Sequence, residues 1–151
     1  MLQTIEQHKF DAVRPDKRRD PKVRKRLSGP AMRAFFQIAD AWRLTVAEQI
    51  ALLGYPGEST YFKYKAGANK TENDDGEGVG ILSFDTLVRV SLILGIFKAL
   101  HILYADESLA DRWVKLPNSN PLFGGNAALA LMTTDIDGLY QVRRLLDGRR
   151  G

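Results

Sequence analysis

The longest mostly apolar stretch of the chain runs from Ser83 to Tyr104, in a sequence that is otherwise rich in charged residues. Its apolar residues recur at the spacing of a helix that is covered from more than one side. Ser83 is a suitable N-cap, and Asp85 places negative charge in the first turn, where the helix dipole favours it. The stretch predicts a buried central helix about 30 Å long, with Gly95 as a break or a point of close packing.

A membrane span is the alternative interpretation of this stretch. Charged or ionisable residues interrupt it and leave only Val90 to Phe97 uncharged, far fewer than the ~20 residues that a bilayer requires. We find no signal-peptide pattern and no lipidation motif. We therefore expect no membrane association. Because the chain has no cysteine, a reducing cytoplasm is the expected location.

Basic residues are concentrated at the start of the chain. Residues 1–30 hold nine Lys or Arg against four acidic residues, a net charge of +5, whereas the whole chain has a net charge of +4. We interpret residues 1–29 as a basic arm of the kind that reaches the phosphates of nucleic acid. A solvated tail that only aids solubility is an equally good interpretation.

Two helices are predicted after this arm. Residues 31–43 have apolar side chains at helical spacing, and Pro30 suits the first turn of such a helix. Thr45 and Glu48 have the spacing of a capping box, in which each side chain binds the backbone N–H of the other residue. They predict a second, short helix that ends before Gly54.

A turn at residues 54–57 then leads to a polar and basic helix over residues 58–65, which completes a helix-turn-helix pattern. The second helix of such a pair enters the major groove, about 12 Å wide, so a short fixed turn is required. A small residue is expected four positions before the turn glycine Gly54, but this chain has Ile50 at that position. Two helices of an ordinary bundle without DNA contact remain the alternative interpretation. The pattern predicts operator DNA contacts from Ser59, Thr60, Tyr61 and Lys63, with Lys65 on the DNA backbone.

Residues 66–82 form a predicted loop with four acidic residues, Glu72, Asp74, Asp75 and Glu77. Their spacing is not that of an EF-hand, and the glycines of the loop lack the strand of a P-loop or a dinucleotide fold. His8 and His101 have no spacing to each other or to carboxylates that would indicate catalysis. We therefore predict no enzyme, no metal and no cofactor, with His101 at a helix surface or interface.

The last third of the chain predicts further helices. Residues 107–116 read as a helix that Pro117 and Asn118 stop, and residues 118–125 read as a compact turn. Two short helices are expected at 126–132 and 135–146. Their apolar positions exceed what one small domain would bury, and helix-turn-helix proteins usually read paired half-sites, so we predict a homodimer through this half.

Several residues in the second half occur in an order that resembles a known family. They are Arg89-x-x-x-Ile93-Leu94-Gly95-Ile96-x-Lys98-Ala99-Leu100, then Trp113, Pro117-Asn118, Phe123-Gly124-Gly125, and Gly138 and Val142 ahead of a terminal Leu-Asp-Gly. Over residues 31–151 the chain resembles the MbcA/ParS/Xre antitoxin family. This resemblance implies an antitoxin whose partner is a RES-domain toxin, which is an enzyme that consumes NAD. It also implies that the antitoxin represses the operon that encodes both proteins.

We thus predict an all-α protein with a basic arm (1–29), a helix-turn-helix domain that includes the central helix (30–105), and a toxin-binding domain (106–151). A glycine at 148 would free the chain end, whose arginines could fork onto carboxylates of the toxin. A frayed terminus is the alternative. A stand-alone regulator or a helical scaffold are the competing functions. The predicted toxin contacts are Tyr140, Arg143, Arg149, Arg150 and Gly151.

Overall fold

The structure is a computed structural model that describes residues 17–69 and 78–151. The predictions for His8, the first part of the basic arm and the four acidic residues of the 66–82 loop lie outside these ranges. The described residues contain no β-strand, only an isolated bridge between Pro117 and Ala127, which confirms the all-α prediction. The helices are α2 (Pro21–Ala41), α3 (Val46–Leu52), α4 (Glu58–Ala68), α5 (Phe84–Leu103), α6 (Glu107–Arg112), η2 (Trp113–Lys115), η3 (Pro121–Phe123), α7 (Ala128–Met132) and α8 (Ile136–Arg150).

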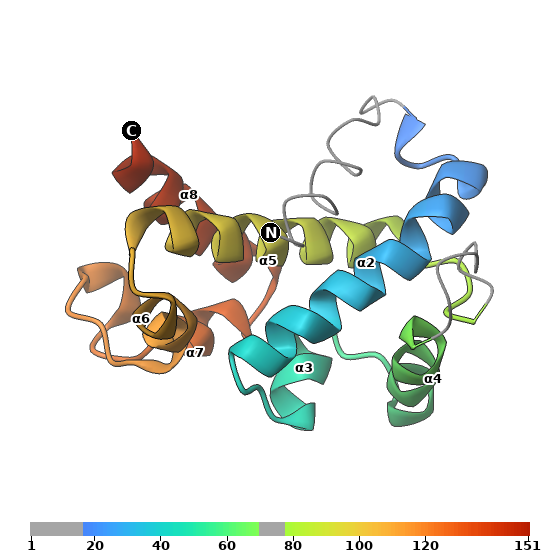
Figure 1. Cartoon of the computed structure of the whole chain (residues 1–151), viewed down its shortest axis with the longest axis horizontal. Coiled ribbons are helices and arrows are strands. Elements are labelled where there is room, and N and C mark those ends of the chain that lie inside the picture. Colours follow the sequence, from blue (N-terminus) through green and yellow to red (C-terminus); the bar gives the residue numbers. More distant parts are fainter. Residues whose placement is uncertain (1–16, 70–77) are drawn as a thin grey trace.

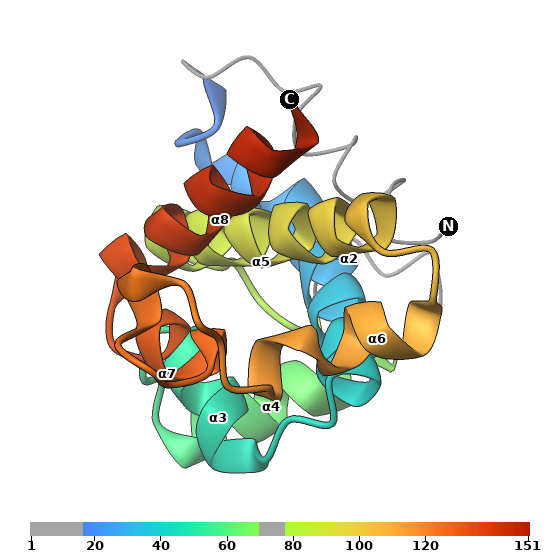
Figure 2. The same ribbon diagram turned by 90° about the vertical axis from the view of Figure 1, so that its left-hand side faces the viewer.

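The predicted central helix is α5, and its bounds agree with the prediction. The Ser83 hydroxyl accepts a hydrogen bond from the Thr86 N–H at 3.1 Å, as expected of an N-cap. Helices α2 and α8 both pack along α5, which runs through the middle of the molecule (Figures 1 and 2). By length and composition alone α5 could cross a membrane, but 56% of its most apolar window is buried inside the protein.

Gly95 does not break α5. A Cβ atom built at this position would lie 1.6 Å from Nη1 of Arg143, so the guanidinium of Arg143 on α8 occupies the space that a side chain would need. Of the two roles predicted for Gly95, a break in the helix or a point of close packing, close packing is therefore confirmed. Gly95 allows α8 to lie directly against α5.

Helix α2 begins nine residues before the start expected at Pro30. Its N-cap is Asp20, whose carboxylate accepts from the Lys22 N–H at 2.8 Å, and Pro21 occupies the first turn. Pro30 lies inside the helix, where it cannot donate a backbone hydrogen bond. The burial of Leu27 and its neighbours offsets the loss of this hydrogen bond. Because residues 21–29 belong to α2, the prediction that the basic arm reaches residue 29 is wrong for these residues.

Basic residues in this early part of the chain hold the start of α5. Nη1 of Arg24 donates to the Leu82 carbonyl at 3.0 Å, and the Ser28 hydroxyl accepts from the Leu82 N–H at 2.9 Å. The guanidinium carbon of Arg19 lies 4.2 Å from the centroid of the Phe84 ring. Arg19 and Arg24 thus contact the chain itself and are not free for nucleic acid in this conformation.

Most of the large apolar residues of α7 and α8 are buried or partly buried within the chain. Met132, Leu139, Val142 and Leu146 are fully buried, and α8 packs against α5. Our argument that one domain could not bury these residues is therefore wrong, because α5 supplies the surface that covers them. The homodimer remains a prediction, but the burial of these residues removes the reason for placing the dimer contact in the C-terminal half.

Candidate functional site

The predicted helix-turn-helix corresponds to α3, a turn and α4. The capping box of α3 is present: the Thr45 N–H donates to Oε1 of Glu48 at 2.8 Å, and the Glu48 N–H donates to the Thr45 hydroxyl at 3.1 Å. Residues 54–57 connect the two helices, as predicted from their composition. Helix α4 starts at Glu58 but continues to Ala68, three residues beyond the predicted end.

The turn is held from both sides. Gly54 has φ +86°, and a Cβ built there would lie 2.9 Å from Nε of Arg89 on α5. Nε of Arg89 is itself bonded to Oδ2 of Asp85 at 2.8 Å. The Tyr55 hydroxyl donates to the Thr133 carbonyl at 3.2 Å, which ties the same turn to the end of α7. The position of α4 therefore depends on contacts from the second half of the chain.

Four of the five predicted DNA-contact residues have exposed or half-exposed side chains on α4. Ser59, Lys63 and Lys65 are exposed, and Thr60 is intermediate. These residues lie along the part of α4 that is turned away from the core. The geometry thus leaves them available to a partner, although nothing in the structure tests which partner it is.

Tyr61 is the exception, because its side chain is fully buried. Its hydroxyl donates to Oε1 of Gln49 at 2.5 Å, and its ring packs edge-on against Phe36, with 5.8 Å between centroids. Burial raises the pKa of Tyr61 above 10.0, with a further contribution from the charge of Asp40. The prediction that Tyr61 faces DNA is therefore wrong: in a helix with 3.6 residues per turn, Tyr61 falls on the core side.

The residues that carry the family resemblance in the C-terminal half build its core and its turns. Trp113 is buried and its ring contacts Phe123 edge-on, with 6.0 Å between centroids. Gly124 and Gly125 have φ values of +55° and +86°, which favour glycine. These contacts hold η3 against η2.

Pro117 and Asn118 close the segment between η2 and α7. Pro117 forms the isolated bridge with Ala127, and the Asn118 N–H donates to the Asn126 carbonyl at 3.1 Å. The Asn118 side chain accepts from the Asn120 N–H at 2.9 Å. The stop that the sequence predicted at Pro117 is confirmed, and the asparagine adds the hydrogen bonds that shape the turn.

Gly138 sits where α7 and α8 approach most closely. A Cβ atom at this position would lie 2.0 Å from the carbonyl oxygen of Leu131. The Gly138 N–H donates to the side chain of Asp135, the N-cap of α8, at 2.9 Å. Only glycine fits between these two backbones without a shift of the chain.

Helix α8 includes the residues that were expected to form a free tail. It extends to Arg150, so Gly148 does not release the chain from the helix and that prediction is wrong. Nε of Arg143 binds Oδ2 of Asp147 at 2.9 Å, and Nη1 of Arg150 lies 3.6 Å from the other carboxylate oxygen. The helix dipole also stabilises the positive charges of Arg149 and Arg150 in the last turn.

Four of the five predicted toxin contacts are exposed on α8 or at its end, and the exposed side of α8 also contains one residue that the sequence analysis missed. Tyr140 is 39% exposed, and Arg149, Arg150 and Gly151 are exposed, whereas Arg143 is turned toward Gly95. Arg144, with 65% of its side chain exposed, lies one turn beyond Tyr140. Helical spacing from Tyr140 would have identified Arg144. We name Asp137, Tyr140, Arg144 and Gly148 the outer stripe of α8.

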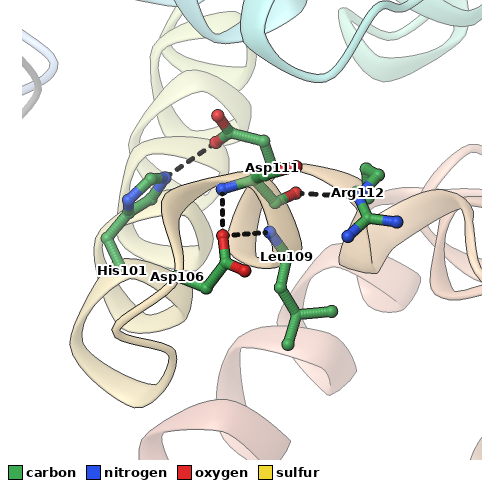
Figure 3. Close-up of polar contacts among 6 residues, drawn as sticks. His101, Asp106, Leu109, Asp111 and Arg112 are labelled. Carbon is green, nitrogen blue, oxygen red and sulfur yellow. Dashed lines mark hydrogen bonds and ion pairs between the residues drawn. The ribbon is translucent and has the colours of Figure 1, made fainter.

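His101 and Asp111 form a contact that the sequence spacing did not indicate. Nε2 of His101 lies 2.8 Å from Oδ1 of Asp111 (Figure 3). The imidazole also stacks on Phe97, with 4.2 Å between centroids. Asp106 caps α6 by accepting from the Leu109 N–H at 3.3 Å in the same view. The His101 side chain is only 8% exposed, so it joins α5 to α6 and does not lie on the surface.

A cleft of about 500 Å³ separates the end of α2 from α6. Trp42, Arg43, Asp111 and Arg112 are among the residues that line it. Nζ of Lys115 donates to the Arg43 carbonyl and lies 3.5 Å from Oε1 of Glu48, which links the two halves beside the cleft. The part of the chain that the structure describes contains no cluster of three or more residues able to hold a metal ion.

Comparisons with known proteins identify the family to which the C-terminal part of the chain belongs. Residues 99–151 match the model of the antitoxin Xre/MbcA/ParS C-terminal toxin-binding domain. An uncharacterized protein of Sinorhizobium fredii (strain NBRC 101917 / NGR234), y4oB, is 44% identical over 121 residues, which cover 80% of this chain and 84% of that protein. No solved structure matches. The chain therefore belongs to the Xre/MbcA/ParS antitoxin family, and its residues 99–151 are the toxin-binding domain of that family.

Proposed function

We propose that this antitoxin binds and neutralises a RES-domain toxin that consumes NAD, and that it represses the shared operon by binding operator DNA. The observation that carries the first part is the match of residues 99–151 to a toxin-binding domain. The second part is supported by the exposed polar and basic residues of α4. We treat the two activities in turn because they use different surfaces.

Toxin binding is best assigned to the outer stripe of α8 and its last turn. Leu139, Val142 and Leu146 of α8 are fully buried and are not available to a partner, whereas Tyr140 is 39% exposed. Arg149, Arg150 and Gly151 end the helix in an exposed position. A site that binds a dinucleotide holds the ribose through acidic groups, and arginine binds a carboxylate with two hydrogen bonds. The last turn of α8 would thus cover the entrance to the NAD site of the toxin.

Co-expression of toxin and antitoxin in cells tests this assignment. The variants are Arg149→Glu/Arg150→Glu and a chain that ends at Asp147. We expect both to reduce the recovery of growth and of NAD levels that the wild-type antitoxin gives. Lys25→Glu/Arg26→Glu is the matched control, because it reverses the charge of two adjacent exposed residues on α2. Full protection by both α8 variants would contradict a role for the last turn.

DNA binding is assigned to α4, with Ser59 and Thr60 near base edges and Lys63 and Lys65 near phosphates. Titration of a labelled promoter fragment at several salt concentrations tests this assignment. Lys63→Ala and Lys65→Ala should each weaken binding to every sequence and lower the salt slope by about one. Ser59→Ala and Thr60→Ala should instead relax the sequence preference. Equal promoter affinity for all four variants would contradict the assignment.

A homodimer is part of the same proposal, because two half-sites of an operator lie about 34 Å apart. The interface is not assigned to the apolar residues of α7 and α8, since these are buried within one chain. Sedimentation at micromolar concentration tests the dimer. A mass equal to that of one chain, independent of concentration and of operator DNA, would contradict it.

A further inference from the structure

Phe62 is a large apolar side chain with an unusual position on α4. It is 51% exposed, although it neighbours the fully buried Tyr61. The exposed residues that share its helix face, three or four positions away, are Glu58, Ser59, Lys65 and Ala66. Because Ser59 and Lys65 are among the residues that we assign to DNA, Phe62 lies within that surface. Covering the exposed part of its ring with an apolar group of a partner would be favourable.

The ring of Phe62 is held in place by the core. Its centroid lies 5.0 Å from that of Tyr61, at an interplanar angle of 77°. Tyr61 is in turn fixed by its hydrogen bond to Gln49 on α3. A ring supported in this way loses little conformational freedom when it contacts a partner.

Phe62 is the fifth residue of α4, which starts at Glu58. In helix-turn-helix proteins, the N-terminal part of the recognition helix contacts the edges of the bases in the major groove. A phenyl ring has no hydrogen-bond donor or acceptor for these edges. The thymine C5-methyl group is the apolar group that the major groove presents, and phenylalanine is one of the side chains that contact it.

We propose that Phe62 contacts the C5-methyl group of a thymine in the operator and thereby selects thymine at that position. This inference rests on the proposed DNA binding by α4. It assigns part of the preference for certain operator sequences to an apolar contact of Phe62, beside the polar contact of Ser59 on the same helix face. Lys63 follows directly and would hold the adjacent phosphate.

The test uses pairs of promoter fragments in which single thymines are replaced by deoxyuridine, which keeps the base pair but lacks the methyl group. For the wild-type protein, replacement of the contacted thymine should lower affinity about fourfold, the effect of losing one buried methyl. Phe62→Ala should bind both members of that pair with equal affinity. Phe62→Leu, which keeps an apolar side chain, should retain part of the difference and controls for misfolding of the alanine variant.

Ile102→Ala is the matched control, because Ile102 is also 51% exposed but lies near the end of α5. It should keep the full difference between thymine and deoxyuridine. Equal binding of all fragment pairs by the wild-type protein would overturn the inference, as would an unchanged difference in Phe62→Ala, and either result leaves DNA binding intact. No binding of the promoter fragment by the wild-type protein would instead remove the proposed DNA binding, and this inference with it.

Discussion

Helix α4 and the C-terminal domain differ in where their most informative residues lie. On α4, the residues that suggested a function are mostly on the surface, and Tyr61 alone is in the core. In the C-terminal domain, Trp113, Phe123 and Gly138 carry the family resemblance and are all buried. These three buried residues therefore maintain the shape of the domain and are not part of the surface that we propose for toxin binding. A match to a family can thus locate a domain without locating its binding surface.

Trp113→Ala should have the largest effect and tests the buried half of this comparison most directly. Loss of the indole leaves a cavity beside Phe123, which we expect to lower the free energy of unfolding by about 3–5 kcal/mol. Tyr140→Ala, at an exposed aromatic residue of α8, should change it by less than about 0.5 kcal/mol. Urea unfolding followed by circular dichroism measures both. Similar values for the two variants would break the comparison.

Gly138→Ala should have the next largest effect. The added methyl would meet the Leu131 carbonyl, so the backbone must shift, and we expect a loss of about 2–3 kcal/mol. Gly95→Ala is its control, because the added methyl meets only the end of the flexible Arg143 side chain. Since alanine also favours a helix by about 1 kcal/mol over glycine, Gly95→Ala should stay within about 1 kcal/mol of wild type. Thermal unfolding of the two variants should therefore differ clearly.

Tyr61→Phe sharpens the comparison at its exception on α4. It leaves the side-chain oxygen of Gln49 without its buried donor, so we expect a loss of about 1–3 kcal/mol at neutral pH. The pKa of Tyr61 is raised above 10.0, so its stabilising contribution is present below pH 10 and is lost as the pH rises through the pKa of the folded state. Tyr61→Phe should thus lose less stability above pH 10 than wild type. Some alkaline loss should remain, because burial also raises the pKa of Tyr64.

Asp147→Asn should have the smallest effect. It removes the charge that pairs with Arg143 and Arg150, but 42% of the Asp147 side chain is exposed. Exposed ion pairs of this kind contribute about 0.2–1 kcal/mol. Unfolding at low and high salt should show a difference from wild type that shrinks as salt increases. A loss as large as that of Gly138→Ala would mean that the surface of α8 also determines the fold.

Much of the helical fold could be predicted from the sequence, because it depends on local signals. The Ser83 cap, the Thr45 and Glu48 capping box and the stop at Pro117 all act within a few residues. The predicted start of α2 at Pro30 is wrong, because a proline that suits a first turn also lies inside this helix. The Asp20-Pro21 pair gave an equally valid local signal nine residues earlier.

The remaining errors concern contacts between residues far apart in the sequence. The burial of Tyr61 depends on Gln49 and Phe36, and Arg143 is engaged because Gly95 opposes it. The pairing of His101 with Asp111 depends on how α5 meets α6. No periodicity within one helix contains this information. Arg144 lies one helical turn from Tyr140 on α8, and Phe62 lies one helical turn from Ser59 on α4. These two residues could therefore have been identified from the sequence.

Helix α5 is shared by both functional parts of the molecule. Its Arg89 supports the turn before α4, and its Gly95 accepts Arg143 from α8. Because the buried residues from α2 to α8 form one continuous core around α5, we expect the chain to unfold in a single cooperative transition. Any partner that binds only the folded C-terminal domain would then also raise the population of folded α4 by mass action. Occupancy by toxin would in this way protect α4, which we propose to bind DNA, from local unfolding and from proteases.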